Sequence, residues 1–362
     1  MREKKCAYPC AYPRILLIQT ASLGDVILST ALVEELHAIF PKTRLDFLTK
    51  TSNAELLKDH PYLNTLWLWD KKKKKYKHLF CLLKEIRKVH YDVVFNVQRF
   101  FSTGFLTTFS NADCKIGFDK NPWSFAWKER VVHRLDKQEI ERNAALIAAL
   151  LQDRGRRWAV PIKENIKYLP KLYPSSNHFQ KVKNYKGMPY FCISPASLWS
   201  TKTWPEHKWI ALSLSLLERY TDARLYFLGS SQDEKSCWNI INKITKENPT
   251  AVSRMENLAG KIDLLSSAAL MQGSVMNYTN DSAPAHLAGA VYAPLTLIFC
   301  STVPSFGFVP IGDKVRVVES KYKLDCRPCG LHGQNKCKKG NFLCAESITI
   351  EEVLGDLPLS LQ

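Results

Sequence analysis

The chain lacks a long apolar segment. Its longest apolar stretch, residues 291–300, is interrupted by Pro294 and Thr296, whereas a helix that spans a bilayer needs about 20 consecutive apolar residues. Residues 1–13 also lack the apolar core of a secretory signal. We therefore expect no transmembrane helix and no secretory signal, and we expect a cytoplasmic protein.

Acidic residues are scarce relative to basic ones. The chain has 34 Asp and Glu against 51 Lys and Arg, which gives a formal net charge of +17. Such an excess predicts an acidic partner, either nucleic acid, an anionic membrane surface or a phosphorylated substrate. The alternative is that the charge only keeps the protein soluble.

The cysteines do not form the even set of a disulfide framework. The 11 cysteines are mostly scattered through apolar segments, which is typical of buried thiols in a reducing cytoplasm. Only four are clustered: Cys326, Cys329, Cys337 and Cys344. Four thiolates can hold zinc tetrahedrally, and the first pair has zinc-like spacing, although the other spacings are irregular. The cluster is therefore compatible with a structural zinc site, and metal-free thiols or disulfides are the alternative.

Apolar strand patterns alternate with helical patterns through both halves of the 362 residues. The first half has strand patterns at 15–18, 44–49, 64–69, 91–97 and 115–118. The second half has them at 190–194, 224–229, 256–260, 274–279 and 294–299. This alternation predicts an α/β protein with a parallel sheet in each half.

The boundary between the halves lies where the periodicity fades. Residues 154–186 are rich in Lys, Pro, Tyr, Asn and Ser, a composition typical of a linker. We predict an N-terminal Rossmann-like domain over residues 1–165, a linker over 166–187 and a C-terminal Rossmann-like domain over 188–345. Residues 346–362 form a tail in which we expect a helix that packs back on the N-terminal domain.

Three loops follow predicted strands and precede predicted helices, and the carboxyl ends of parallel strands are where α/β sheets bind ligands. The first loop contains Gly24 and Asp25. The second contains Lys202 among hydroxyl residues, which suit a diphosphate. The third, residues 279–284, offers free N–H groups at a helix N-terminus, a ready anion site. Taken singly, the second is better explained as an ordinary polar loop, and the third could equally be a helix cap made by Asp281 or Ser282.

Taken together and in this order, the three loops resemble the ADP-heptose:lipopolysaccharide heptosyltransferases, glycosyltransferase family nine. The matching segments are Gly24-Asp25-Val26 followed by Ser29 and Thr30, Lys202-Thr203-Trp204-Pro205, and Asn280-Asp281-Ser282-Ala283-Pro284-Ala285-His286-Leu287-Ala288. The resemblance covers residues 14–345. Ala283 departs from it, because the family usually has glycine there. Alanine disfavours a left-handed backbone and adds a methyl group near the expected phosphate.

The resemblance implies a GT-B fold, in which two Rossmann-like domains face each other across a cleft. It implies inverting transfer of heptose from ADP-heptose to the lipopolysaccharide inner core, with a Kdo-lipid A or heptosyl acceptor. No metal or other cofactor is required for this reaction. The expected protein is a monomer, peripheral to the inner membrane and in contact with its inner leaflet, and it does not bind nucleic acid.

The resemblance also implies roles for individual residues. Asp25 is the general base, and Lys202 neutralises the leaving diphosphate. The donor-binding set is Ser197, Lys202, Asp233, Glu234, Asn280, Asp281, Ser282, Ala283 and His286. The acceptor-binding set is Gly24, Ser29 and Thr30.

A lysine-rich segment lies outside these motifs. Residues 71–75 are five consecutive lysines, and apolar residues recur at helical spacing through 79–89. This pattern predicts either a basic amphipathic helix that contacts anionic lipid headgroups or an ordinary surface helix.

Two other functions are compatible with parts of the sequence. The same fold could transfer another nucleotide sugar to a cell-surface glycan. A basic nucleic-acid-binding protein with a four-cysteine zinc module would explain the charge and the cysteines, but it leaves the three loops unexplained.

Overall fold

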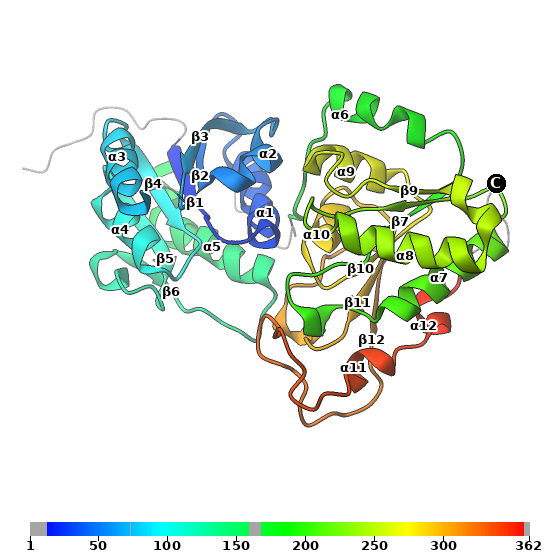
Figure 1. Cartoon of the computed structure of the whole chain (residues 1–362). Coiled ribbons are helices and arrows are strands. Elements are labelled where there is room, and N and C mark those ends of the chain that lie inside the picture. The colour runs from blue at the N-terminus through cyan, green and yellow to red at the C-terminus, as the bar shows by residue number, and fades with distance from the viewer. Residues whose placement is uncertain (1–12, 73, 159–167, 358–362) are drawn as a thin grey trace, which may run out of the picture. The chain divides into compact units, whose positions relative to one another are not determined.

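The structure is a computed structural model that describes residues 13–72, 74–158 and 168–357. The chain divides into two compact units, unit 1 (Met1–Lys171) and unit 2 (Leu172–Gln362), which are coloured blue to green and green to red in Figure 1. Each unit contains one six-stranded sheet in which all paired strands are parallel. The predicted α/β class is confirmed for both halves.

Unit 1 alternates strands and helices along the chain. Its strands are β1 (Arg14–Ile18), β2 (Arg44–Lys50), β3 (Leu63–Trp69), β4 (Tyr91–Asn96), β5 (Ala112–Phe118) and β6 (Glu129–Val131). Its helices are α1 (Leu23–Ile39), α2 (Ala54–Leu57), α3 (Lys75–Arg87), α4 (Phe101–Phe109) and α5 (Glu139–Trp158). The sheet order is β3-β2-β1-β4-β5-β6, so β1 and β4 lie at its centre.

The central strands of unit 1 are apolar because both faces of the sheet are covered by helices. All four residues from Ile15 to Ile18 are completely buried, as are Val93, Val94 and Phe95 of β4. Helix α1 packs against α5, and α3 packs against α4. Strand β6 was not expected, since it has only three residues and two of them are charged.

Unit 2 repeats the alternation. Its strands are β7 (Tyr190–Ser194), β8 (Arg224–Phe227), β9 (Met255–Asn257), β10 (Met276–Asn280), β11 (Leu295–Phe299) and β12 (Val315–Glu319). Its helices are α6 (Ser176–Lys181), α7 (Glu206–Arg219), α8 (Glu234–Glu247), α9 (Leu264–Gln272), α10 (Ala283–Ala290), α11 (Leu343–Glu346) and α12 (Ile350–Leu354). The sheet order is β12-β11-β10-β7-β8-β9.

The C-terminal segment packs on unit 2. Ile348 and Val353 are completely buried in the hydrophobic core of that unit, together with Trp209 of α7. The Arg219 guanidinium of α7 donates a 2.7 Å hydrogen bond to the carbonyl oxygen of Leu357. The expectation that this segment packs on the N-terminal domain is wrong for residues 346–357, because its apolar side chains complete the core beside α7. Residues 358–362 lie outside the described part of the chain.

Across residues 13–72, 74–158 and 168–357, we find no helix with the combined length and apolarity that crossing a bilayer requires.

Candidate active site

Asp25 occupies the first turn of α1, directly after the loop that follows β1. The N–H and Oγ of Ser22 donate hydrogen bonds of 3.0 and 2.6 Å to Asp25 Oδ2, and the Asp25 N–H lies 3.4 Å from Ser22 Oγ. This capping box satisfies N–H groups at the start of the helix, where the helix dipole also favours a carboxylate. The half-buried Asp25 side chain is therefore held in place at the carboxyl edge of the unit 1 sheet.

The other residues of this motif that were expected to bind the acceptor substrate do not reach the surface. Ser29 and Thr30 are completely buried, and their hydroxyl groups donate 2.7 Å bonds to the carbonyl oxygens of Val26 and Ile27. The prediction that these hydroxyls bind the acceptor is wrong, because they lie beyond the first turn of α1 and face its packed side. Gly24 is also buried, within that first turn.

Two lysines that were not predicted as site residues surround the Asp25 loop. Lys71 Nζ donates bonds of 2.9 and 2.8 Å to the carbonyl oxygen and Oγ1 of Thr20. Burial, together with the charges of Lys50 and Lys75, lowers the pKa of Lys71 to about 8. Burial also lowers the pKa of Lys50, whereas the nearby Asp25 carboxylate raises it. The carboxyl ends of β1, β2 and β3 thus bring two lysines close to the Asp25 carboxylate.

A buried ion pair lies close to the same edge. Glu139, the first residue of α5, accepts a 2.9 Å bond from Arg142 Nε, and Arg142 is 3% exposed. Burial raises the pKa of Glu139, and the charge of Asp25 raises it further, whereas Arg142 lowers it. Asp25 therefore interacts electrostatically with residues from β2 and α5 as well as with its own loop.

In unit 2, the loops after three neighbouring strands converge on one carboxylate. Asp281, which follows β10, forms a 2.7 Å ion pair with Lys202 of the loop after β7. The Thr302 hydroxyl, from the loop after β11, donates a 2.6 Å bond to the same oxygen of Asp281. Both charged side chains are largely buried. The two motif loops predicted to bind the donor are thus in direct contact.

Asn280 connects these loops through the backbone. Its Oδ1 accepts a 2.9 Å bond from the Trp204 N–H, and its Nδ2 donates a 2.8 Å bond to the Pro195 carbonyl oxygen. Asn280 is completely buried. The predicted contact with the donor is therefore replaced by a positioning role, because both ends of the amide bind loop backbone.

Helix α10 begins immediately after Asp281. Ser282 is its N-cap in an extended conformation, and Ala283 is its first residue. Ala283 does not have a positive φ, so alanine is compatible with the backbone at this position. His286 lies further along the helix and is 8% exposed. Alanine at residue 283 thus allows the same helix start as the glycine that is usual in the family.

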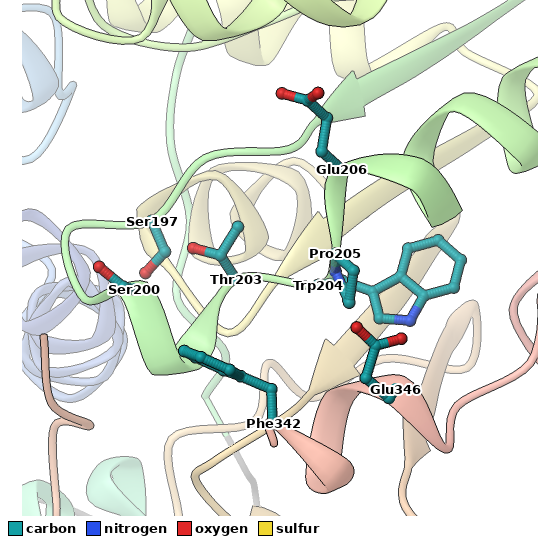
Figure 2. A pocket seen from close by; sticks show the side chains of 8 residues that line it. All are labelled: Ser197, Ser200, Thr203, Trp204, Pro205, Glu206, Phe342 and Glu346. Atoms are coloured by element: carbon teal, nitrogen blue, oxygen red, sulfur yellow. The ribbon is translucent and has the colours of Figure 1, made fainter. Parts of the chain in front are cut away.

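The remaining predicted donor residues lie in two other places. Asp233 directly precedes α8 and accepts bonds of 2.8 and 2.7 Å from the N–H and Oγ of Ser230, and Glu234 is the first residue of that helix. Ser197 lines a pocket of about 400 Å³. The pocket is lined by Ser197, Ser200, Thr203, Trp204, Pro205, Glu206, Phe342 and Glu346 (Figure 2). Two carboxylates line this pocket, and that of Glu206 forms an ion pair with Lys243.

The segment between β12 and α11 holds the Lys202 loop in place. The Gln334 N–H donates a 2.8 Å bond to Thr201 Oγ1, and the Thr201 N–H donates a 3.0 Å bond to the Gln334 carbonyl oxygen. Gly333 has a φ of +77°, and a Cβ atom at this position would lie 2.8 Å from Lys202 Cγ. The absence of a side chain at residue 333 therefore lets this segment pack on the stem of Lys202.

We expect Gly333→Ala to lower kcat about tenfold or more, because the added methyl group displaces Lys202 and misplaced catalytic groups are costly. Gly330→Ala is the matched control: Gly330 has a φ of +76° in the same segment, but a Cβ atom there meets nothing within 4 Å. Steady-state kinetics and thermal unfolding of both variants separate backbone strain from the Lys202 contact. Equal losses of kcat in the two variants would contradict this role for Gly333.

The cysteine cluster belongs to the same segment. Cys326, Cys329 and Cys337 are half-buried, Cys344 is buried, and all four are free thiols. Burial raises the pKa of Cys344 to about 11. Within the described ranges of the chain, no group of three or more His, Cys, Asp or Glu side chains is arranged to hold a metal ion. The arrangement of the four thiols does not support a zinc site, which stays a prediction from the sequence.

Comparison with known proteins identifies one family. The sequence pattern of glycosyltransferase family 9 (heptosyltransferase) matches residues 79–339. Lipopolysaccharide heptosyltransferase 3 of Escherichia coli is 26% identical over 291 residues, which are 77% of this chain and 81% of that protein.

Solved structures show the same fold. The structure of E. coli ADP-heptose lps heptosyltransferase II matches with a TM-score of 0.76 and 20% identity, over 94% of this chain and 96% of that one. The iron-containing dodecameric glycosyltransferase TibC from enterotoxigenic E. coli H10407 matches with a TM-score of 0.56 and 16% identity, over 95% and 75% of the two chains. These similarities confirm the predicted GT-B fold class.

Proposed function

The chain belongs to glycosyltransferase family 9, the heptosyltransferases, and from that premise we propose that it transfers heptose from ADP-heptose to the lipopolysaccharide inner core with inversion at the anomeric carbon and without a metal ion. The observation that carries this proposal is the contact between Lys202 and Asp281 at the start of α10. It brings a cation and a helix N-terminus together, as a diphosphate donor requires.

Lys202 can donate hydrogen bonds to the nucleotide sugar. An ammonium group carries three N–H donors, and one of them is directed to Asp281, 2.7 Å away. The others are available to oxygen atoms of the diphosphate. As the bond between the anomeric carbon and the diphosphate oxygen breaks, negative charge grows on ADP, and a fixed cation stabilises that charge. Lys202 and the N–H groups at the start of α10 therefore take the part that a metal ion has in other transferases.

Asp25 is the proposed base. The acceptor hydroxyl oxygen attacks the anomeric carbon from the face opposite the diphosphate, which inverts the configuration, and Asp25 takes the hydroxyl proton. The Ser22 N–H and Oγ both bind Oδ2, which orients Oδ1 toward the substrate in this proposal. Because a carboxylate is a weak base, its effect comes mainly from placement and from its charge.

The lysines beside Asp25 fit an acidic acceptor. Lys50 and Lys71 are half-buried, and cations in such surroundings interact more strongly with an anion than fully hydrated ones do. A lysine with a pKa of about 8, such as Lys71, is still mostly charged at neutral pH. Kdo sugars and lipid A carry carboxylates and phosphates, so an inner-core acceptor supplies the complementary charge. We accordingly propose a cytoplasmic enzyme that is peripheral to the inner membrane.

A donor screen tests this proposal. The purified chain is given ADP-heptose, ADP-glucose, UDP-glucose or GDP-mannose with a Kdo-lipid acceptor, in the presence of EDTA, and the product is measured by mass spectrometry. We expect a heptosylated product with ADP-heptose and at least about a hundredfold lower kcat/KM with the hexose donors, since missing hydrogen-bond partners in a polar sugar site are strongly penalised.

Preferred use of a UDP- or GDP-sugar would overturn the assignment of the donor while leaving family membership unaffected. Turnover that disappears with EDTA and returns with a divalent metal ion would overturn metal independence.

A further inference from the structure

Aromatic side chains from three segments of unit 1 form one surface cluster. Its members are Phe80 of α3, Phe101, Phe105 and Phe109 of α4, and Trp123 and Phe125 of the segment between β5 and β6. Phe105 lies at its centre, with ring-centroid distances of 5.6 Å to Phe80 and 5.8 Å to Trp123. Phe125 is 74% exposed, Phe101 62% and Phe80 58%. This aromatic cluster is an exposed apolar patch on a protein with a formal net charge of +17.

The cluster is held in a fixed arrangement. Asn121, 2% exposed, donates bonds of 3.0 and 3.2 Å to the carbonyl oxygens of Gln98 and Phe100, and it accepts a 3.0 Å bond from the Trp123 N–H. A Cβ atom on Gly104 would lie 2.1 Å from Asn121 Oδ1 and 2.8 Å from Trp123 Cδ1. The loop can therefore close onto α4 only because residue 104 has no side chain.

Exposed basic residues lie on the segments that form the aromatic cluster and on those next to them. The exposed basic residues of α3 and of the segments next to α4 and Trp123 are Lys75, Lys77, Lys84, Arg87, Arg99, Lys120 and Lys128. Exposed acidic charge on α3 is limited to Glu85 among its described residues, and Glu85 forms an ion pair with Lys88. Aromatic rings next to cations are typical of surfaces that bind at the interface of an anionic bilayer, where rings enter the headgroup region and cations meet phosphates.

Two other partners fit this surface less well. A second copy of the chain would bring two cationic patches together, which like-charge repulsion opposes. Single-stranded nucleic acid is anionic but requires ring faces on which bases stack. In the aromatic cluster, Trp123 packs edge to face with Phe105 and Phe109, which occupies ring faces within the protein.

We propose that the aromatic cluster and the exposed basic residues on and next to its segments dock the enzyme on an anionic phospholipid bilayer. This inference rests on the proposed function, because a lipid-linked acceptor lies in such a bilayer. Helix α4 follows β4, and the carboxyl end of β4 lies beside that of β1, with Asn96 paired to Ile18. Docking through α4 thus brings to the bilayer the sheet edge that carries Asp25.

Vesicle co-sedimentation of the full chain tests the surface. Vesicles of phosphatidylcholine, with or without phosphatidylglycerol, are mixed with the wild type, with a Phe101→Ser/Phe125→Ser variant and with Tyr322→Ser. Tyr322 is the matched control, because it lies in unit 2 and is 62% exposed, as Phe101 is. We expect the wild type and Tyr322→Ser to bind the anionic vesicles equally, and the double variant to bind about tenfold or more weakly, since each lost ring removes apolar area from the interface.

Transfer assays distinguish this inference from the proposed function. With an acyl-free, water-soluble acceptor, the double variant should keep the wild-type rate, whereas transfer to a vesicle-embedded acceptor should fall with vesicle binding. Equal vesicle binding by the double variant and the wild type would overturn the docking surface, and so would displacement of the wild type from vesicles by an oligonucleotide at low concentration. Failure of the proposed function would instead appear as no transfer by the wild type to the soluble acceptor.

Discussion

Replacing Asp25 with asparagine is expected to lower kcat about a thousandfold, which is within the range for loss of a general base. Asparagine keeps the shape of the side chain and can still accept hydrogen bonds from Ser22 at one atom, but it cannot take a proton at neutral pH. Because the donor is proposed to bind unit 2, the affinity for ADP should be unchanged. Steady-state kinetics and calorimetric titration with ADP measure the two quantities separately.

The control for Asp25→Asn is another capping aspartate. Asp263 caps α9 and accepts a 2.7 Å bond from the Ser266 N–H, and it has no role in the proposed reaction. Asp263→Asn should lower Tm, because a charged cap is lost, and should leave kcat unchanged. If Asp25→Asn retained more than about a tenth of the wild-type kcat, the role of Asp25 as the base would be refuted.

Replacing Lys202 with alanine is expected to lower kcat about a hundredfold or more and to weaken ADP binding. The variant removes the cation that faces the leaving diphosphate, and the loss of one charge-stabilising donor typically costs 10²–10³ in kcat. It also leaves the largely buried Asp281 without its ionic partner, which adds like-charge repulsion toward ADP. The stabilisation of the protein by ADP, measured as the shift in Tm, should therefore shrink as well.

Lys243→Ala provides the comparison for Lys202→Ala. Lys243 forms a 2.6 Å ion pair with Glu206 on the exposed surface of unit 2, so its loss should change neither kcat nor the ADP-induced shift in Tm. If Lys202→Ala kept the wild-type shift in Tm and the wild-type kcat, the diphosphate would bind elsewhere.

The sequence was sufficient to predict the three motif loops and all the strands except β6 and β12. Buried parallel strands consist of runs such as Ile15–Ile18, which leave a clear apolar pattern. The motif loops were informative because their residues are contiguous in the chain. By contrast, the three residues of β6 are too few and too polar to form a pattern.

Parts of the site that depend on distant segments could not be predicted. Lys71 was one of five lysines expected either to contact lipid headgroups or to lie on an ordinary surface helix, but its Nζ binds Thr20, which lies 51 residues earlier. The packing of Gly333 on Lys202 joins segments that are even more remote in sequence. Ser29 and Thr30 show the converse error, since the family motif placed them in one site with Asp25 although one turn of helix carries their side chains into the core.

The C-terminal segment was misplaced for a related reason. Its apolar residues, including Ile348 and Val353, indicate packing against a core but do not specify which core. Two units of similar architecture offer similar apolar surfaces, so the partner is decided by side-chain fit around α7.

The most direct test of the account is the anomeric configuration of the product. Heptose labelled with ¹³C at the anomeric carbon is transferred from ADP-heptose to a soluble Kdo acceptor in the presence of EDTA, and the one-bond carbon–proton coupling is measured by NMR. A base at Asp25 and a diphosphate held by Lys202 without metal predict a product with the configuration opposite to that of the donor. A product that retains the donor configuration, or no product until a divalent metal is restored, would contradict it.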